Sequence, residues 1–288
     1  MPELPEVETL KLGLRKYFVG HKILDIEIRV PKIFQGDKAL VIGARVTDIK
    51  RVGKGLIIEL DNDFDLVVHL KMTGQMVYRD SSTSKLSLSP KVGGETLPSK
   101  YSHVIFSLDK GSRLYFNDLR RFGYIKVIKK QNLENLPFFK EMGPEPFKNT
   151  DFGQKPLNFS GFKTILSKSG LPIKVLLMDQ KKIGGIGNIY ANEALYEAKI
   201  SPTRKAKEVG EKEAEVLFDA IYEVINRGLK FGGSSDENFV NVLGQDGQYQ
   251  QHFLVYGREK EKCKRCGATF EKIQLGGRGT YFCPKCQK

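Results

Sequence analysis

The first residues of the chain place a proline beside two carboxylates that could act with it. Pro2 follows the initiator methionine, and because residue 2 is small we expect Met1 to be removed, which leaves Pro2 with a free secondary amine. An α-amino group titrates at about 7.7–8.0, so about 10% of it is an unprotonated nucleophile at neutral pH. A secondary amine that attacks an aldehyde-level carbon gives an iminium, the intermediate of Schiff-base catalysis. The alternative is that Pro2 and Pro5 only open a helix, where proline and the acidic Glu3 and Glu6 are favoured.

The four cysteines form a second group with chemistry. They lie near the end of the chain as two close pairs, Cys263-x2-Cys266 and Cys283-x2-Cys286, with room for a β-hairpin between them. This spacing predicts one structural Zn²⁺ in a closed tetrahedral site, with no open position for catalysis. The metal would hold together a segment too short to bury much core. Two disulfides are the alternative, and they conflict with a reducing compartment.

The composition points to a polyanionic partner. The 288 residues hold 47 Lys and Arg against 34 Asp and Glu, a net charge of +13. Such an excess favours nucleic acid first and an anionic membrane surface second. No run approaches the ~20 apolar residues of a membrane span. Glu3, Glu6 and Glu8 do not fit the basic start of a signal peptide, so we expect a cytoplasmic protein.

The elements that must position these residues differ between the two halves of the chain. Apolar residues recur every three or four positions over residues 4–18, which predicts an amphipathic helix closed by Gly20. Short strand patterns follow, with a hairpin turn at residues 109–111. We therefore expect a β-sandwich behind an N-terminal helix, with a mobile loop over residues 79–100. The predicted strands are 22–30, 55–60, 65–72, 75–79, 103–108, 113–116 and 123–128.

Prolines and glycines between residues 131 and 160 separate this half from a helical one. Helical patterns cover residues 162–166, 174–180, 188–198 and 211–229, and residues 239–253 are typical of a loop. The fold class is thus α+β with several domains. We predict a catalytic β-sandwich domain over 1–135, a linker over 136–160, a helical DNA-binding domain over 161–250 and a zinc ribbon over 251–288.

Three segments together resemble a known family. They are residues 2–8 (PELPEVE), 187–191 (GNIYA) and 277–287 (GRGTYFCPKCQ). In this order they are similar to the formamidopyrimidine-DNA glycosylases, bacterial enzymes that remove 8-oxoguanine, and the resemblance runs from residue 2 to 288. It implies a base-excision repair enzyme with a helix–two-turn–helix unit, acting on damaged double-stranded DNA without a soluble cofactor. It also implies an abasic-site lyase activity that cuts the backbone by β- and then δ-elimination.

The resemblance assigns catalytic roles to five positions. Pro2 would be the nucleophile at C1′ of the damaged nucleoside, and Glu3 would handle protons during base loss and opening of the sugar. Glu6 would support them from one helical turn further on. Lys54, in the segment RVGKGL, would contact the lesion or its phosphate and help proton transfer. Arg278 would grip the phosphates around the flipped nucleotide and assist the second elimination.

Further positions would contact DNA. A flipped base leaves a hole in the duplex, and the family fills it with side chains that match Met72, Arg120 and Phe122. Read without the resemblance, Met72 and Phe122 would be core residues. Lys174 and Asn188 match residues near the DNA backbone, since a helix N-terminus such as that of Asn188 suits a phosphate. The loop over 242–251 would close over the flipped base.

Several positions depart from the family pattern. Tyr101 stands where a histidine often contacts phosphate, and Leu119 replaces the usual proline. Ser169 replaces a basic residue, with Lys168 beside it as a substitute. None of these departures touches Pro2, Glu3 or Lys54, so we expect retained activity.

Three alternatives stay open. The first is the sister activity against oxidised pyrimidines, as in endonuclease VIII, although residues 4–8 and 277–287 favour the purine enzyme. The second is a non-catalytic DNA-binding protein, which retention of Met1 would favour. The third is a zinc-ribbon protein of the ribosome or polymerase, which leaves Pro2, Glu3, Lys54 and Asn188 unexplained. We expect a monomer, because every apolar stripe is used within a domain.

Overall fold

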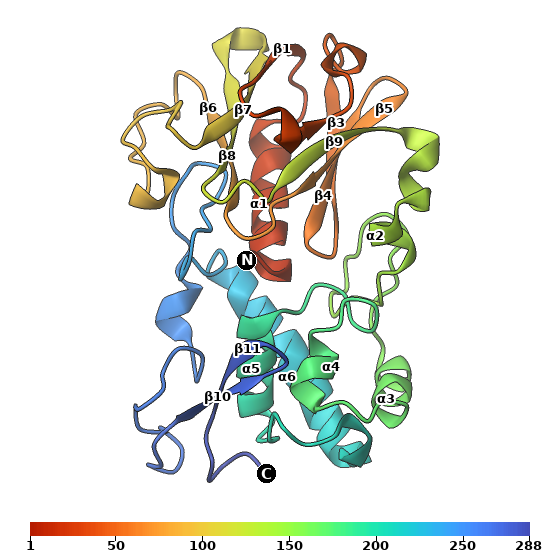
Figure 1. Cartoon of the computed structure of the whole chain (residues 1–288), viewed down its shortest axis with the longest axis vertical. Helices are drawn as coiled ribbons and strands as arrows, with labels where there is room; N and C mark the ends of the chain where they lie inside the picture. The colour runs from red at the N-terminus through yellow and green to blue at the C-terminus, as the bar shows by residue number, and fades with distance from the viewer. The chain divides into compact units, whose positions relative to one another are not determined.

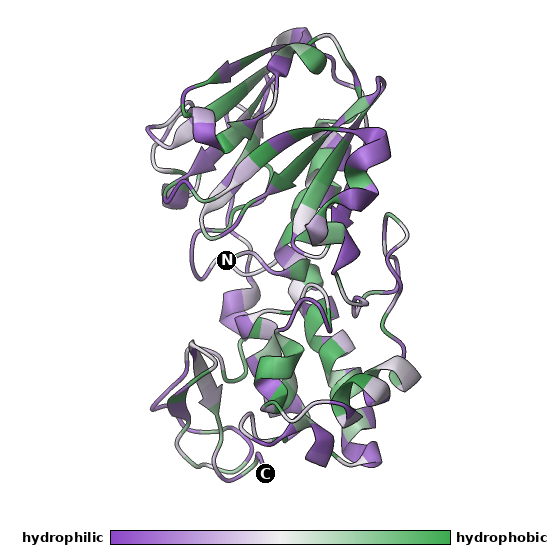
Figure 2. Ribbon diagram, turned by 45° about the vertical axis from the view of Figure 1, so that its right-hand side comes forward, coloured by the Kyte–Doolittle hydropathy of each residue, from purple (hydrophilic) through white to green (hydrophobic). Residues whose placement is uncertain are grey.

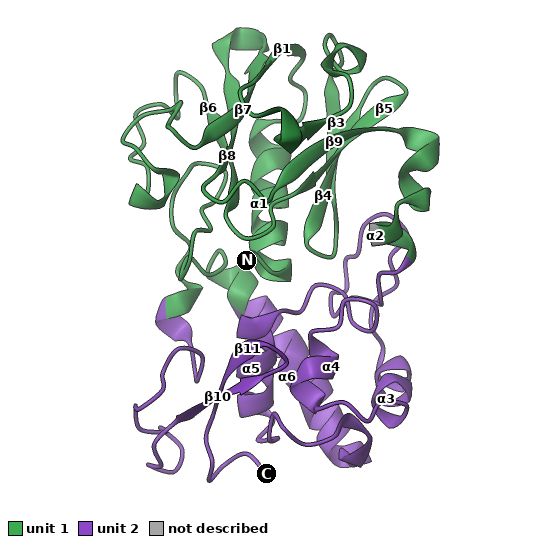
Figure 3. Cartoon of the chain, in the orientation of Figure 1, with its two compact units in different colours: residues 1–140, 228–250 green, residues 141–227, 251–288 purple. Residues whose placement is uncertain are grey.

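The computed structural model describes residues 1–137 and 139–288, and the chain divides into two compact units (Figure 3). Unit 1 consists of Met1–Lys140 together with Gly228–Gln250. Unit 2 consists of Glu141–Arg227 together with Gln251–Lys288. Each unit is therefore built from two stretches of chain.

Unit 1 is a β-sandwich with a leading helix, as the sequence predicts (Figure 1). Neighbouring strands are antiparallel except for the short parallel pair β2 and β9. One sheet has the order β1(Ile23–Ile28), β7(Ser102–Leu108), β8(Arg113–Asp118), β6(Gly74–Arg79). The other has the order β2(Phe34–Gln35), β9(Tyr124–Lys129), β5(Phe64–His69), β4(Gly55–Leu60), β3(Val46–Val52).

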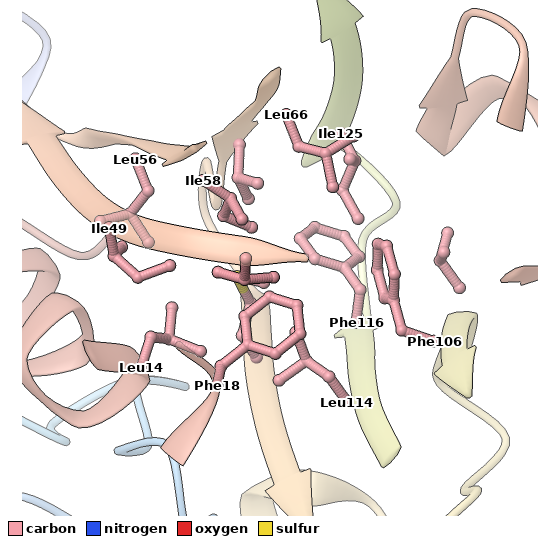
Figure 4. Close-up of a cluster of buried hydrophobic side chains, with 14 of the residues drawn as sticks. Leu14, Phe18, Ile49, Leu56, Ile58, Leu66, Phe106, Leu114, Phe116 and Ile125 are labelled. Carbon is pink, nitrogen blue, oxygen red and sulfur yellow. The ribbon is translucent and has the colours of Figure 1, made fainter. Parts of the chain in front are cut away.

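Helix α1(Leu4–Tyr17) packs against the core of the sandwich. Leu4, Val7, Leu10 and Leu14 recur at helical spacing and are fully buried, and Phe18 continues the same stripe just beyond the end of the helix. Figure 4 shows Leu14 and Phe18 against side chains of both sheets, among them Ile49 and Phe116. Apolar residues also run along many strands in Figure 2. The core thus anchors the helix that carries the N-terminal motif.

Residues 228–250 complete the same core. Phe239 and Val242 belong to its buried cluster. The backbone N–H of Tyr78 in β6 donates to the carbonyl of Val242 at 2.8 Å, and that of Ser89 donates to the carbonyl of Gly244 at 2.8 Å. This segment is therefore an integral part of the sandwich.

Unit 2 combines helices with a two-stranded ribbon (Figure 1). Helix α6(Glu211–Lys230) has one apolar face, on which Leu217, Ile221 and Val224 are all buried. Of the described helices, none has the length and apolar character needed to cross a membrane. The helices are α3(Phe159–Ser167), α4(Ile173–Leu177), α5(Asn188–Glu197) and α6(Glu211–Lys230), and the ribbon strands are β10(Glu271–Leu275) and β11(Arg278–Phe282).

The observed elements correct several predicted boundaries. The strand predicted over 65–72 ends at His69, because Lys71 has a positive φ of 53° and begins a turn. The helix predicted over 174–180 ends at Leu177. Strands β2 and β3 have no counterpart among the predicted ones.

Short helical elements connect the longer ones. They are the helix α2(Pro137–Lys140) and the 3₁₀ turns η1(Pro31–Ile33), η2(Lys38–Leu40), η3(Pro90–Val92), η4(Asp109–Gly111), η5(Lys130–Asn135), η6(Ala206–Glu208) and η7(Tyr249–His252).

The predicted loop over 79–100 contains only the 3₁₀ turn η3 as regular structure. Its ends are held by side chains: Arg79 donates to the carbonyl of Thr83 at 2.6 Å, and Ser99 donates to that of Val92 at 3.0 Å. Peptide groups inside the loop are therefore bonded, and its mobility stays a prediction.

Candidate active site

The N-terminus of α1 is organised by a buried carboxylate. One oxygen of Glu6 accepts the backbone N–H of Glu3 at 2.8 Å, and the other accepts the N–H of Ser234 at 2.8 Å. Glu3 and Glu6 are 4% and 1% exposed, and Pro2 is buried beside them. Glu6 thereby ties the first turn of α1 to the segment after α6 and sets the position of Pro2 and Glu3.

Met1 occupies the position next to this site. Its ammonium lies 2.7 Å from the Glu237 carboxylate. Burial, followed by the nearby charge of Glu237, raises the pKa of Asp236 above its ordinary value. While Met1 is attached, the nitrogen of Pro2 is an amide and has no nucleophilic lone pair. A nucleophilic role for Pro2 would therefore require that Met1 be removed.

Lys54 lies in the tight turn between β3 and β4. Val52 pairs with Gly55, so only Gly53 and Lys54 form the loop, and Gly53 has a φ of 54°. A two-residue hairpin needs a positive φ at its first position, which glycine adopts without strain. Lys54 is only 6% exposed. The turn presents this lysine from a rigid scaffold.

A buried ion pair links this turn to α1. Arg51 donates through Nε to Glu8 at 2.7 Å and through Nη1 to the carbonyl of Gly53 at 3.0 Å. Glu8 also pairs with Lys11 at 2.6 Å. Arg51 is fully buried and Glu8 is 4% exposed. The helix that begins beside Pro2 and the loop that carries Lys54 are thus held in one frame.

His69, for which the sequence predicts no role, completes this region. It ends β5, directly opposite Gly55 in β4. Burial, then the charges of Lys71 and Lys54, lowers the pKa of His69 to about 3. Its Nδ1 accepts the N–H of Lys71 at 3.0 Å. The imidazole is therefore neutral and puts no second positive charge beside Lys54.

Two turns carry the residues assigned to the hole in the duplex. Met72 lies in the turn between β5 and β6 and is half-buried, whereas Arg120 and Phe122 lie between β8 and β9. Phe122 is 52% exposed, and the guanidinium of Arg120 lies over its ring at 4.8 Å from the centroid. An exposed aromatic on a tight turn is not a core residue, so the core interpretation of Phe122 is wrong.

One carboxylate, from a residue that the sequence analysis missed, organises both turns. Asp118 ends β8 opposite Gly74 and is fully buried. It accepts the hydroxyl of Thr73 from the first turn. From the second turn it accepts the N–H of Arg120 at 3.1 Å and that of Gly123 at 2.7 Å. The two turns therefore share one anchor.

Tyr101 precedes β7 in unit 1 and is half-buried. Its carbonyl accepts the N–H of Asp118 at 3.0 Å. Its ring lies against Gly93, where an added Cβ would meet it at 2.2 Å. Any side chain at residue 93 would therefore displace the Tyr101 ring.

Unit 2 presents Asn188 and Lys168 at helix ends. Asn188 is the first residue of α5, directly after the N-cap Gly187, whose backbone is extended. Lys168 is exposed at the C-cap of α3. The N-terminus of a helix is electropositive and suits an anion.

Lys174 supports the hairpin that carries Arg278. Its side chain is fully buried, and its ammonium donates to the carbonyl of Gly279 at 2.9 Å and to the hydroxyl of Thr280 at 2.7 Å. Arg278 is exposed at the first position of β11. The predicted contact of Lys174 with DNA stays a prediction, and the geometry shows that this lysine positions the strand of Arg278.

The four cysteines form the predicted metal centre. The sulfurs of Cys263, Cys266, Cys283 and Cys286 all lie within 4.8 Å of one another. Those of Cys263 and Cys286 are 3.9 Å apart, and those of Cys266 and Cys283 are 3.5 Å apart. A tetrahedral site with Zn–S bonds of about 2.3 Å separates its sulfurs by about 3.8 Å, so the four thiols fit one zinc ion.

The protonation of these thiols also calls for a cation. Burial, followed by the hydrogen bonds that its thiol donates to the other sulfurs, raises the pKa of Cys286 to about 12. Four thiolates this close repel one another, and a divalent cation at their centre removes the penalty. Zinc would be held by all four sulfurs, with no position left for substrate.

The residues with assigned roles are divided between the two units. Unit 1 holds Pro2, Glu3, Glu6, Lys54, Met72, Tyr101, Arg120 and Phe122. Unit 2 holds Lys168, Lys174, Asn188, Arg278 and the four cysteines.

Comparisons with known proteins cover both units. Family models match three consecutive parts of the chain: the formamidopyrimidine-DNA glycosylase N-terminal domain over residues 1–125, the H2TH domain of the same enzymes over 142–239, and a zinc finger found in FPG and IleRS over 260–288. Formamidopyrimidine-DNA glycosylases of Desulforamulus reducens and Streptococcus mutans are each 38% identical to the chain. The alignments cover 100% of this chain with 99% and 100% of those proteins.

Solved structures agree with these matches. A Lactococcus lactis FPG mutant in complex with Fapy-dG-containing DNA superposes with a TM-score of 0.86 at 34% identity, over 100% of both chains. The MutM (FPG) protein of Thermus thermophilus superposes with a TM-score of 0.84 at 36% identity, over 99% of this chain and 98% of that one.

Proposed function

Since the chain belongs to the formamidopyrimidine-DNA glycosylase family, we propose that it removes oxidised purines from duplex DNA and then cuts the abasic strand. The observation that supports this most directly is the frame around the N-terminus. Pro2 and Glu3 lie at the start of α1, Glu6 anchors that turn, and the Glu8–Arg51 ion pair holds the Lys54 loop to the same helix. Rigid placement of a nucleophile and its proton-transfer groups is what this reaction requires.

The reaction begins when removal of Met1 frees the Pro2 amine. Its nitrogen forms a bond to C1′ as the bond to the oxidised base breaks, and the base leaves with a proton. Glu3 is positioned to move protons as the sugar ring opens to the iminium. Loss of the proton at C2′ expels the 3′ phosphate, and a second elimination expels the 5′ phosphate. Water then hydrolyses the remaining imine and releases the enzyme.

Lys54 and Arg278 are the cations of this scheme. Lys54 contacts the lesion or its phosphate and assists proton transfer, and the neighbouring His69 stays neutral and adds no positive charge beside it. Arg278, exposed at the start of β11, grips the phosphates around the flipped nucleotide. The net charge of +13 supports attraction of the duplex over long range.

The base-flipping step uses the two turns anchored by Asp118. The exposed Phe122, with Arg120 stacked on it, is suited to enter the stack of bases, and Met72 fills the space left by the flipped nucleotide. Lys168, Asn188 and Tyr101 contribute contacts to the DNA backbone, and the buried Lys174 acts through the strand that carries Arg278. The protein works as a monomer in the cytoplasm, on nucleoid DNA.

The test is chemical trapping. Purified protein is incubated with an 8-oxoguanine:cytosine duplex and sodium borohydride, which reduces an iminium to a permanent amine. A covalent protein–DNA band that maps to residue 2 supports the proposal, and it should weaken in Pro2→Gly, which keeps an α-amine but loses the secondary amine and its fixed ring. Glu3→Gln should bind the duplex but release little base. Tight binding without a trapped band would instead favour a non-catalytic DNA-binding protein, and a band only with an oxidised pyrimidine would favour the sister activity.

A further inference from the structure

Helix α5 is bonded to the zinc ribbon along its length. Asn192 accepts the N–H of Tyr281 at 2.8 Å through its side-chain oxygen. The fully buried Glu193 accepts three consecutive N–H groups, those of Leu254, Val255 and Tyr256, at 2.8–2.9 Å. The ribbon is therefore seated on this helix by polar bonds as well as by packing.

The last contact along α5 reaches the metal centre. Tyr196 is 4% exposed and belongs to the same buried cluster as Cys263, Phe270 and Cys283. Its hydroxyl lies 3.3 Å from the sulfur of Cys263. A zinc-bound thiolate has no proton to give, so the hydroxyl is the donor in the metal-loaded protein.

We propose that Tyr196 is a positioning residue for the zinc centre, donating a hydrogen bond to the Cys263 thiolate that slows its dissociation from the metal. Four thiolates around one Zn²⁺ leave a net charge of −2, and each N–H or O–H donor aimed at a sulfur offsets part of it. Loss of such an outer partner generally lowers metal affinity about 10- to 100-fold.

The ring of Tyr196 is held so that its hydroxyl has one direction. Arg265, from the loop between Cys263 and Cys266, lies over the ring at 4.3 Å from the centroid and donates to the Tyr196 carbonyl at 2.6 Å. Arg265 also pairs with Glu197 at 3.0 Å. The ring of Phe270 packs edge-on against that of Tyr196, with the two ring centroids 5.6 Å apart. The metal-binding loop thus clamps the residue that bonds to its own sulfur.

Tyr196 also lines a cavity in unit 2. A space of about 470 Å³ in unit 2 is lined by Tyr196, Lys264 and Arg265, together with residues of the 251–258 segment and the ends of α5 and α6. Lys264 and Arg265, which lie between Cys263 and Cys266 in the chain, bring this wall next to the first cysteine pair in sequence. Because Tyr196 forms part of the wall and is bonded to Cys263, it separates that sulfur from solvent.

The experiment compares Tyr196→Phe with the matched control Tyr222→Phe in the full-length, zinc-loaded protein. Tyr222 is on α6 of the same unit, and its hydroxyl donates to the carbonyl of Leu157 at 2.7 Å, away from the metal. Zinc transfer to a chromogenic chelator is followed at pH 7. We expect transfer about tenfold faster from Tyr196→Phe than from the wild type, and unchanged from Tyr222→Phe.

A spectroscopic readout separates hydrogen bonding from packing. In the cobalt-substituted protein, the sulfur-to-cobalt charge-transfer band should move to lower energy in Tyr196→Phe, because a thiolate without its donor gives electrons more readily. Phe270→Leu disturbs packing around the ring but keeps the hydroxyl, so its band should stay in place. The proposal is overturned if Tyr196→Phe matches the wild type in band position and transfer rate, or if Phe270→Leu shifts the band equally.

Discussion

His69 provides a quantitative test of the site, because its protonation is coupled to folding. The unfolded chain protonates this imidazole at its ordinary pKa of about 6.5. In the folded protein, burial and the charges of Lys71 and Lys54 lower that pKa to about 3. Between these two values the unfolded state binds a proton that the folded state does not bind. The free energy of unfolding must therefore decrease as the pH falls through this window.

The size of the effect follows from the two pKa values. At pH 5, the unfolded imidazole is almost fully protonated and the folded one is neutral, which costs the folded state about 2 kcal/mol relative to neutral pH. The full difference, reached near pH 3, is about 5 kcal/mol. His69→Gln removes the titration while keeping a side-chain oxygen that can accept the N–H of Lys71. The variant should lose about 2 kcal/mol less than the wild type between pH 7.5 and 5.

The assay is urea unfolding followed by far-ultraviolet circular dichroism at both pH values and constant ionic strength. The quantity of interest is the difference between wild type and variant, in which titrations common to both proteins cancel. Equal losses of stability in the two proteins would refute the reasoning. So would an NMR titration in which the His69 imidazole has a midpoint near its ordinary pKa.

Other perturbations test separate parts of the structure. Gly13→Ala should lower Tm, because its Cβ would lie 2.6 Å from Val242 Cγ1, and overpacking costs about 1–3 kcal/mol against a helix-propensity gain of about 1 kcal/mol; a higher Tm would contradict this. Asp118→Ala removes both oxygens that accept the three hydrogen bonds, so stability should fall by at least about 1–3 kcal/mol and both turns should show faster amide exchange, whereas faster exchange in only one turn would argue against a shared anchor. Glu193→Gln should raise amide exchange at residues 254–256, and unchanged protection would show that these bonds matter little. Removal of zinc by a chelator should expose the cysteines to thiol reagents and weaken duplex binding, and full retention of binding would separate the ribbon from DNA recognition.

Local patterns explain why some features could be predicted. The helix at the N-terminus and the zinc centre each depend on residues close together in sequence, with helical spacing in one and paired cysteines in the other. The hairpin at residues 109–111 likewise follows from its turn residues. Such signals need no knowledge of the fold.

Features that depend on distant contacts were not visible. Strand β3 contains Asp48, Lys50 and Arg51, so its sequence lacks the apolar pattern that predicts a strand. Arg51 is nevertheless buried, because it pairs with Glu8. Asp118 acquires its role only when β8 lies beside β6, which brings it to Thr73. The neutral state of His69 likewise results from burial, and composition carries no signal for it. The assignments of Pro2, Glu3, Lys54 and Arg278 rest on the resemblance and await the trapping experiment.

The division of unit 1 between two stretches of chain has a consequence for its synthesis. Residues 1–140 leave the ribosome first, but Phe239, Val242 and the Ser234 amide that bonds to Glu6 arrive about a hundred residues later. Until then the sandwich lacks part of its core, and the first turn of α1 lacks one of its anchors. A nascent chain stalled before residue 228 should therefore hold an incomplete reactive end. The order of translation delays assembly of the nucleophile's surroundings until almost the whole protein has been made.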